Sequence, residues 1–356
     1  MPCYQSKRWR MAVIALTNAV LAANSVAAFA EPAPAYHLVD SVPLGAPDRW
    51  DYVVFDAPSH RVYVAHGDRV SVIDGRDGAV VGQVEGAPGG THGIGLSHAT
   101  GKGYTDDGKA GVAVVFDLKT LKTLKTIPAQ DDADGIAFDQ ASGHIFIVDG
   151  DTTKITVIDP VTDTAAAAID GGGKLEYAVS DDHGHLYVNG EEKREIVRID
   201  TRTNAVDAHW PMADCADPHG LAIDTAAHRL FASCVNAKLM VINADTGALV
   251  AVLPIGRGSD AVAFDPVRKR VFSSDGLDGI VSIFQQTGPN SYVPLPPVKT
   301  AVSGRTMALD PQTGRLYIAA SDVEASATPG ARAKPKPGAL KLLFLDPTDT
   351  SIGSRP

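Results

Sequence analysis

The chain has 356 residues, of which 44% are apolar and 6% aromatic, and it carries a formal net charge of −10. This composition supplies enough apolar side chains for a large core, but the body of the chain has no apolar run long enough to cross a bilayer. An acidic protein repels phosphate backbones, and no basic patch offsets the charge. The composition therefore argues against nucleic acid as a partner.

The first thirty residues have the three-part order of a secretory signal peptide. Three positive side chains within residues 7–10 precede a mostly apolar stretch, residues 11–23, and small residues then lead to Ala28 and Ala30. We expect cleavage after Ala30, which removes three positive charges and moves the net charge from −10 to −13. The alternative, an uncleaved membrane anchor, is opposed by two polar residues that interrupt the apolar stretch. The mature protein is therefore expected in the periplasm or outside the cell, with no transmembrane segment.

A repeated pattern follows, in which a short apolar strand ends just before a turn. Its seven copies are Phe55-Asp56, Leu96-Ser97, Phe138-Asp139, Val179-Ser180, Ile223-Asp224, Phe264-Asp265 and Leu309-Asp310. They recur at intervals of 41, 42, 41, 44, 41 and 45 residues, the length of a four-stranded propeller blade. The strands between them are short and rich in Val, Ile, Phe and Tyr, and turns with Asp, Asn or Gly close them. This pattern leaves little room for helices.

The repeat predicts an all-β protein, a seven-bladed β-propeller of four-stranded antiparallel blades. The propeller is expected to span residues 31–356, after the signal peptide of residues 1–30, with blades near 49–86, 90–129, 133–172, 174–213, 217–256, 259–299 and 304–346. The last blade has too little chain after Asp346 for a fourth strand, whereas residues 36–44 form an isolated strand pattern. We therefore expect the N-terminal strand to complete the last blade and close the ring, which removes open sheet edges.

Cys215 and Cys234 are the two cysteines that remain after the predicted cleavage. An even pair in an oxidising compartment predicts a disulfide, and both residues are expected at the same end of an antiparallel strand pair. Two buried thiols are the alternative. A disulfide here would be structural, because it would close about 20 residues of chain.

Several motifs together point to one family. They are residues 175–179 and 186–189, the segment from Cys215 to Cys234 with residues 219–224, and residues 260–265. This set resembles the YVTN-repeat, YncE-like family of bacterial β-propellers, and the resemblance covers essentially the whole mature chain. It implies an exported protein that recognises a ligand or partner. It specifies no activity, because propellers host binding proteins, lyases, lactonases and redox enzymes on one scaffold.

One position in each repeat is a candidate for the mouth of the central channel. The innermost strand of each blade begins at the channel, so the residue five before the end of each anchor belongs to a ring. The ring positions are Asp51, His92, Asp134, Leu175, His219, Asp260 and Arg305, with Glu176 beside the apolar exception. Such a ring can be a hydrated pore mouth, a metal site, or a site for a cationic or polar small molecule, and spacing alone does not choose among these.

The sequence leaves two functions open. The first is an exported ligand- or partner-binding module that acts through its channel-mouth residues, Asp51, His92, Asp134, Glu176, His219, Asp260 and Arg305. The alternative is a metal-dependent lyase or lactone hydrolase, in which one divalent metal ion is the candidate cofactor and its ligands are His92, His219 and Asp260. No motif identifies a catalytic residue. We expect a monomer whose partner is a small molecule or another protein.

Overall fold

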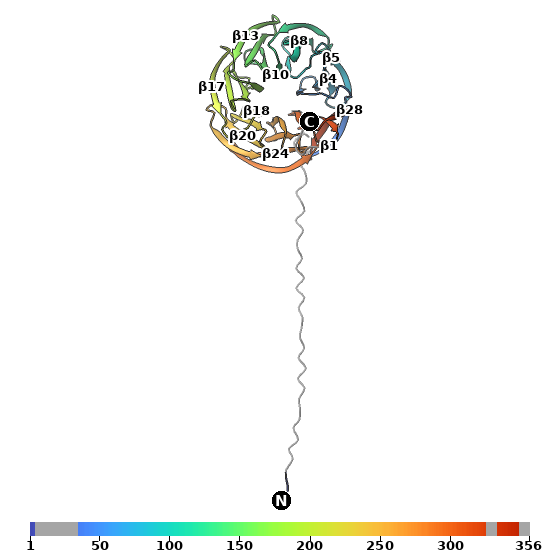
Figure 1. Ribbon diagram of the computed structural model, residues 1–356, viewed down its shortest axis with the longest axis vertical. Coiled ribbons are helices and arrows are strands. Elements are labelled where there is room, and N and C mark those ends of the chain that lie inside the picture. The colour runs from blue at the N-terminus through green and yellow to red at the C-terminus, as the bar shows by residue number, and fades with distance from the viewer. Residues whose placement is uncertain (4–34, 325–332, 349–356) are drawn as a thin grey trace, which may run out of the picture. The chain divides into compact units, whose positions relative to one another are not determined.

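The computed structural model describes residues 1–3, 35–324 and 333–348 (Figure 1). From residue 36 onward the described chain forms seven four-stranded antiparallel sheets arranged in a ring, so the predicted seven-bladed β-propeller is confirmed. The predicted signal peptide lies outside the described residues apart from residues 1–3. Within the described residues the single helical element is the 3₁₀ turn Gly108–Ala110, and no helix there is long and apolar enough to span a bilayer.

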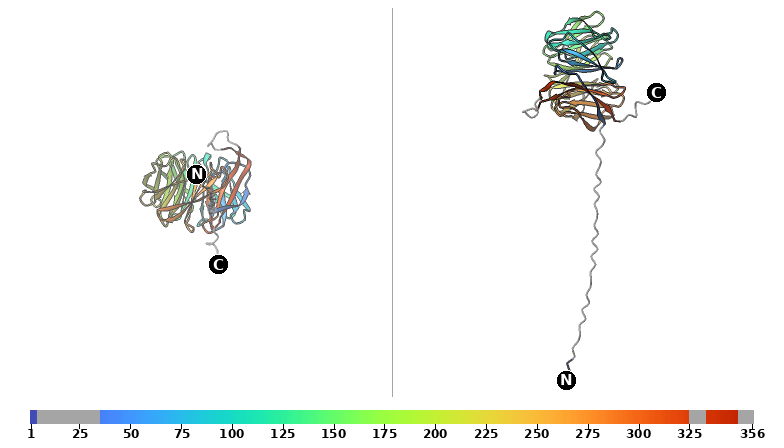
Figure 2. Two further views of the ribbon diagram at one scale, coloured as in Figure 1. Left: turned by 90° about the horizontal axis from the view of Figure 1, so that it is seen from below. Right: turned by 90° about the vertical axis from the view of Figure 1, so that its right-hand side faces the viewer.

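The sheets follow one another along the chain, each running from an inner to an outer strand. Figure 1 places the first strands, such as β10 and β18, towards the centre and fourth strands such as β13 and β17 at the rim, and Figure 2 shows the ring from two sides. Blades 1 to 4 consist of β2(Val53–Asp56), β3(Arg61–His66), β4(Arg69–Asp74), β5(Val80–Val84); β6(Ile94–Ser97), β7(Lys102–Asp107), β8(Val112–Asp117), β9(Thr123–Pro128); β10(Ala133–Asp139), β11(His144–Asp149), β12(Lys154–Asp159), β13(Thr164–Asp170); β14(Leu175–Ser180), β15(His185–Gly190), β16(Glu195–Asp200) and β17(Ala205–Pro211). Blades 5 to 7 consist of β18(Pro218–Asp224), β19(Arg229–Cys234), β20(Lys238–Asn243), β21(Leu249–Pro254); β22(Ser259–Asp265), β23(Arg270–Asp275), β24(Ile280–Gly288), β25(Ser291–Lys299); β26(Thr306–Leu309), β27(Leu316–Val323), β28(Pro335–Pro347) and β1(Tyr36–Pro43).

The recurrent Asp of the sequence pattern caps the turn that follows the first strand of a blade. In blade 6 one oxygen of Asp265 accepts hydrogen bonds from the backbone N–H groups of Val267 and Arg268, both at 2.8 Å. In blade 7 Asp310 accepts from the Gln312 N–H at 2.9 Å and from the Thr313 hydroxyl at 2.6 Å. The turn satisfies its own backbone through this side chain, which is why Asp marks the repeat so regularly.

The core consists of seven apolar layers, one between each pair of neighbouring blades. Between blades 3 and 4, for example, Phe146 and Val148 of β11 pack with Leu186 and Val188 of β15, all fully buried. Both faces of the middle strands are covered, so these strands are almost continuously apolar instead of alternating. The inter-blade layers therefore fix the positions of the inner strands and of the side chains at their ends.

The last blade combines strands from both ends of the described chain. Its sheet order is β1-β28-β27-β26, and β1 runs antiparallel to β28 with Tyr36 opposite Pro347 and Val42 opposite Leu342. Tyr36 is almost completely buried and its ring meets that of Phe272 edge-on at 5.2 Å, a contact with blade 6. The outer strand of the last blade is thus supplied by the N-terminal segment, as its sequence pattern indicated.

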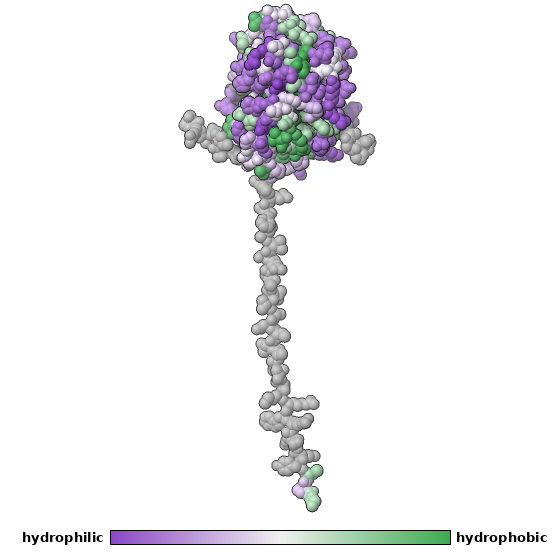
Figure 3. Space-filling view, turned by 90° about the vertical axis from the view of Figure 1, so that its left-hand side faces the viewer, coloured by the Kyte–Doolittle hydropathy of each residue, from purple (hydrophilic) through white to green (hydrophobic). Residues whose placement is uncertain are grey.

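The rim of the propeller exposes the outer strands. Figure 3 shows the side that carries β17 and β20, which is largely hydrophilic and has its most extended apolar area in the lower part of the view. Exposed apolar side chains on the nearby outer strands include Leu249 and Val252 of β21 and Val293 of β25. The β25 segment also contains three prolines within residues 294–297. Proline removes backbone donors, so it makes this sheet edge a poor template for pairing with another chain.

Candidate ligand-binding site at the channel mouth

The predicted ring residues lie at the irregular beginnings of the inner strands. In blades 3, 4, 5 and 6 the pairing of the first strand shifts register at positions that include Asp134, Glu176, His219 and Asp260. Such an irregularity changes the direction of a side chain relative to the regular pleat. In blade 4 it leaves Leu175 fully buried in the core, while Glu176 is the residue that faces the cavity.

A cavity of about 240 Å³ lies at these strand ends. It is lined by Asp51, Tyr52, Lys174, Glu176, Glu191, His219, Asp260, Arg305 and Thr306. Five of the seven ring residues predicted from the sequence therefore share one cavity: Asp51, Glu176, His219, Asp260 and Arg305. The other two, His92 and Asp134, do not line it, although the charge of Asp51 affects the pKa of both.

Arg305 connects blade 7 to its neighbours on both sides. Its Nη1 lies 2.5 Å from a carboxylate oxygen of Asp260 in blade 6, and its Nη2 donates to the backbone carbonyl of Trp50 at 2.8 Å. The Asp51 carboxylate is more distant, 4.0 Å from Nη1. Arg305 is thus oriented by Asp260 and by a main-chain acceptor, and its positive charge is largely matched by Asp260.

His219 lies between two carboxylates. Its Nδ1 is 3.6 Å from Glu176 and 3.5 Å from Asp260. Its backbone is held from behind, because the Asn189 amide donates to the His219 carbonyl at 2.7 Å.

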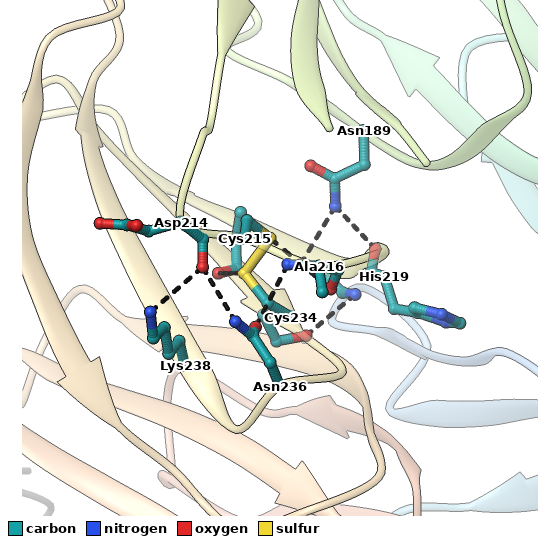
Figure 4. The surroundings of a disulfide bond; sticks show 11 residues. Asn189, Asp214, Cys215, Ala216, His219, Cys234, Asn236 and Lys238 are labelled. Atoms are coloured by element: carbon teal, nitrogen blue, oxygen red, sulfur yellow. Dashed lines mark hydrogen bonds between the residues drawn. A yellow bond between two sulfur atoms is a disulfide. The ribbon is translucent and has the colours of Figure 1, made fainter. Parts of the chain in front are cut away.

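The Cys215–Cys234 disulfide joins the segment before β18 to the end of β19, with the two Cα atoms 5.3 Å apart. In Figure 4 the His219 ring points away from the disulfide, so the bond anchors the strand without blocking the side chain. The predicted pairing of these two cysteines is confirmed. The bond restrains the chain just before the strand that carries His219.

Two carboxyl groups at the site are held towards their neutral form. Burial raises the pKa of Asp134 well above its usual range, and the charge of Asp51 adds to this effect. Burial likewise raises the pKa of Glu176, with repulsion from Asp134 and Asp51. Within the described residues one oxygen of Asp134 is buried with no hydrogen-bond partner. The crowding of acidic groups at the site therefore makes ionisation of these two carboxyls unfavourable.

An aromatic pair stands beside these carboxyls. The rings of Tyr52 and Tyr177 lie 4.8 Å apart with a tilt of 38°. In the described part of the chain the Tyr52 hydroxyl is buried without a hydrogen-bond partner. Burial and the charge of Asp134 raise the pKa of Tyr52, so the phenol stays neutral. Of the two rings, Tyr52 lines the cavity, while Tyr177 packs against the core between blades 4 and 5.

His92 is held apart from this cavity by a buried acid. Its Nδ1 lies 2.7 Å from Asp106, whose other oxygen accepts from two backbone N–H groups at 2.8 Å. Burial alone lowers the pKa of His92, but the hydrogen bond and charge of Asp106, together with Asp134 and Asp51, raise it to about 9. The ring is thus oriented by Asp106 with Nε2 directed away from that carboxylate.

The three residues predicted as metal ligands do not converge. His219 and Asp260 are neighbours, but His92 makes no hydrogen bond or ion pair with either in the part of the chain that the structure describes. In that same part, no group of three or more His, Cys, Asp or Glu side chains is arranged to hold a metal ion. The geometry separates an acidic cavity from a His92–Asp106 pair.

The ring positions taken from the sequence did not include several cavity residues, namely Tyr52, Lys174, Glu191 and Thr306. Lys174 and Glu191 pair with each other at 2.9 Å across the start of blade 4. Tyr52 follows Asp51 directly, and Thr306 follows Arg305. The sequence therefore contained an indication of Tyr52 and Thr306, since each stands next to a ring position. They were not predicted because only one position in each repeat was considered.

Comparisons with known proteins bear on the fold. No protein-family model matches the chain, and no curated protein matches it. A chain of hydrazine synthase from Kuenenia stuttgartiensis has a TM-score of 0.68 at 13% identity, covering 92% of this chain and 99% of that one. The RRP9 WD40 repeats give 0.72 at 11% identity, with 88% and 99% covered. This chain is a seven-bladed β-propeller.

A third solved structure, from the mitotic checkpoint complex, has a TM-score of 0.69 at 15% identity and covers 94% of this chain and 98% of that one. All three identities are far below the level at which function carries over, so the likeness concerns the scaffold alone. The function of this propeller has to be argued from its own side chains.

Proposed function

We propose that this propeller is an exported binding protein, of the YVTN-repeat, YncE-like kind, that holds a small organic cation in the channel-mouth cavity. The cavity has more acidic groups than cations, with Asp51, Glu176, Glu191 and Asp260 against Lys174 and Arg305. Lys174 pairs with Glu191 and Arg305 with Asp260, so both cations are already engaged. Among the described residues the one basic side chain within 4 Å of the Glu176 carboxylate is His219, at 3.6 Å.

The observation that carries this proposal is Glu176, a carboxyl that lines the cavity and has no Lys or Arg within 4 Å among the described residues. Burial raises the pKa of Glu176, and the charges of Asp134 and Asp51 add to this effect, so ionising Glu176 is unfavourable when no cation is near. A bound cation would reverse this penalty, and the cation would gain the attraction of a poorly solvated carboxylate. Tyr52, which lines the cavity, favours an organic ammonium over a hydrated inorganic ion, because an alkylated cation also gains from an aromatic ring.

The test is a binding measurement with matched ligands. We expect a diamine such as putrescine, or choline, to raise the unfolding temperature and to give a calorimetric isotherm, whereas the neutral analogue 1,4-butanediol does neither. Glu176→Gln should weaken cation binding about tenfold or more, the loss of one charge-assisted contact. Glu192→Gln, an exposed neighbour outside the cavity lining, should leave binding unchanged. Equal binding by both variants would overturn the assignment of this cavity.

Export is the second part of the proposal. The signal-like N-terminal segment supports it, and so does the Cys215–Cys234 disulfide, since such bonds persist in oxidising compartments. In a Gram-negative host, mass spectrometry of the periplasmic fraction should find a mature chain that begins at Glu31. A full-length chain retained in the cytoplasm would contradict export and leave the binding test unaffected.

The alternative of a metal-dependent lyase or lactone hydrolase has weaker support. His219 with Glu176 and Asp260 offers a nitrogen beside two carboxylates, but the third predicted ligand, His92, belongs to a different pair. Elemental analysis of chelator-free protein beside a His92→Ala/His219→Ala double variant distinguishes the two readings. One equivalent of metal in the parent and none in the variant would favour the alternative.

A further inference from the structure

Arg49 is a cation whose partner is another nitrogen base. Its Nη2 lies 2.9 Å from Nε2 of His92. Among the described residues His92 is the one side chain that shares a hydrogen bond with Arg49. In the same part of the chain no carboxylate lies within 4 Å of the guanidinium. The loop before blade 2 passes close beneath it, since a Cβ at Gly90 would lie 3.2 Å from Nη1. Arg49 is exposed, so its charge is accessible to a ligand from solvent.

This contact brings two donors towards each other. A guanidinium has donors only, so Arg49 and His92 share a hydrogen bond only while Nε2 of His92 carries no proton. Asp106, behind the ring, together with the charges of Asp134 and Asp51, outweighs the effect of burial and raises the pKa of His92 to about 9, which favours the doubly protonated imidazole. At neutral pH His92 is therefore doubly protonated, and its Nε2–H and an N–H of Arg49 are directed at the same small region between the two side chains. Two such donors are satisfied together by one anionic acceptor.

An apolar pocket of about 190 Å³ adjoins Arg49. Its lining includes Arg49, Trp50, Leu277, Val302, Val323 and Pro335, most of them apolar. Asp48 also lines it, and its two carboxylate oxygens accept from the backbone N–H groups of Gly338 and Ala339 at 2.7 and 2.9 Å. Trp50 forms one wall, and the guanidinium of Arg305 lies over its ring at 5.7 Å. Arg305 also lines the acidic cavity, so the two spaces are separated by this side chain. The pocket thus has a cationic edge and an apolar interior.

We propose that Arg49 and His92 bind the carboxylate of an apolar organic acid, whose apolar body occupies the pocket beside Trp50. A carboxylate has two oxygens in one plane, which suits two converging donors. A single negative charge also suits the surroundings better than a phosphate dianion, because Asp106 lies directly behind His92 and the whole chain is acidic. The pocket lined by Leu277 and Val302 then gains its affinity from the apolar part of the ligand.

The experiment uses phenylacetate as the probe, measured by calorimetry on the full mature protein at pH 7. We expect phenylacetate to bind at least tenfold more tightly than acetate, which lacks the apolar body, or phenylacetamide, which lacks the charge. Inorganic phosphate is the second anion, and tighter binding of phosphate than of phenylacetate would overturn the carboxylate assignment. Affinity should also fall above pH 9, as His92 loses its proton among Asp106, Asp134, Asp51 and Arg49.

Two variants locate the site. Arg49→Gln should weaken phenylacetate binding at least tenfold, whereas Arg202→Gln, an exposed arginine in a turn after β16, should not. Val302→Phe should fill the pocket and reduce phenylacetate binding to the level of acetate. Putrescine binding should survive Arg49→Gln, so failure here is distinguishable from failure of the cation site. Unchanged phenylacetate affinity in Arg49→Gln would refute the proposal.

Discussion

Asp149 ends β11 with a buried carboxyl. The Thr156 hydroxyl donates to one oxygen at 3.0 Å, while the other oxygen has no partner among the described residues. Burial raises the pKa of Asp149 from 3.8 to about 7. Because the folded pKa is above the unfolded one, ionisation costs stability: the loss begins near pH 4 and is complete above about pH 7.

Replacing Asp149 by Asn removes this titration and keeps an acceptor for Thr156. The shift from 3.8 to about 7 corresponds to about 4 kcal/mol, so Asp149→Asn should gain up to that much stability relative to the parent between pH 4 and pH 8. Urea unfolding followed by circular dichroism at several pH values measures the difference. Asp151→Asn, an exposed carboxyl two residues away, is the control. A difference that stays constant with pH, or the same gain in the control, would refute the reasoning.

Two further predictions concern the parts of the chain that hold the site and the last blade. The Cys215→Ser/Cys234→Ser variant should lose about 3 kcal/mol of unfolding free energy, because two cysteines 19 residues apart no longer cross-link the unfolded chain. An unchanged urea midpoint would show that the bond is dispensable. Tyr36→Ala should lose about 3 to 5 kcal/mol, the cost of removing a buried aromatic ring, while His37→Ala, exposed on the same strand, should cost under 1 kcal/mol.

The fold could be predicted because its period is imposed by local chemistry. Each blade needs a tight turn after its first strand, and a short acceptor side chain such as Asp265 satisfies that turn. The apolar strands then follow at regular intervals, since every blade packs in the same way against the blade on each side of it. The pairing of the N-terminal strand with the last blade could be predicted because the residues after Asp346 lack a strand pattern, whereas residues 36–43 have one.

The site could be predicted only in part because side-chain direction is set by backbone irregularities. The sequence column pointed to Leu175, yet the register shift in β14 buries that residue and leaves Glu176 at the cavity. His92 was grouped with His219 because their positions in the repeat are equivalent. The two histidines differ because Asp106 lies close enough to form a hydrogen bond with the His92 ring. Such a contact depends on the length and direction of the side chains, which the spacing of residues in the sequence does not give.

The pairing of β1 with β28 also sets an order in time. About 300 residues separate the two strands, so β1 has no partner until nearly the whole chain has emerged, whether from a ribosome or across a membrane. Until then the strand that carries Tyr36 and Val42 stays unpaired, although blades 1 to 6 can already form from contacts closer in sequence. The last blade is therefore the one sheet whose assembly waits for both ends of the propeller, and β1 is its longest-waiting strand.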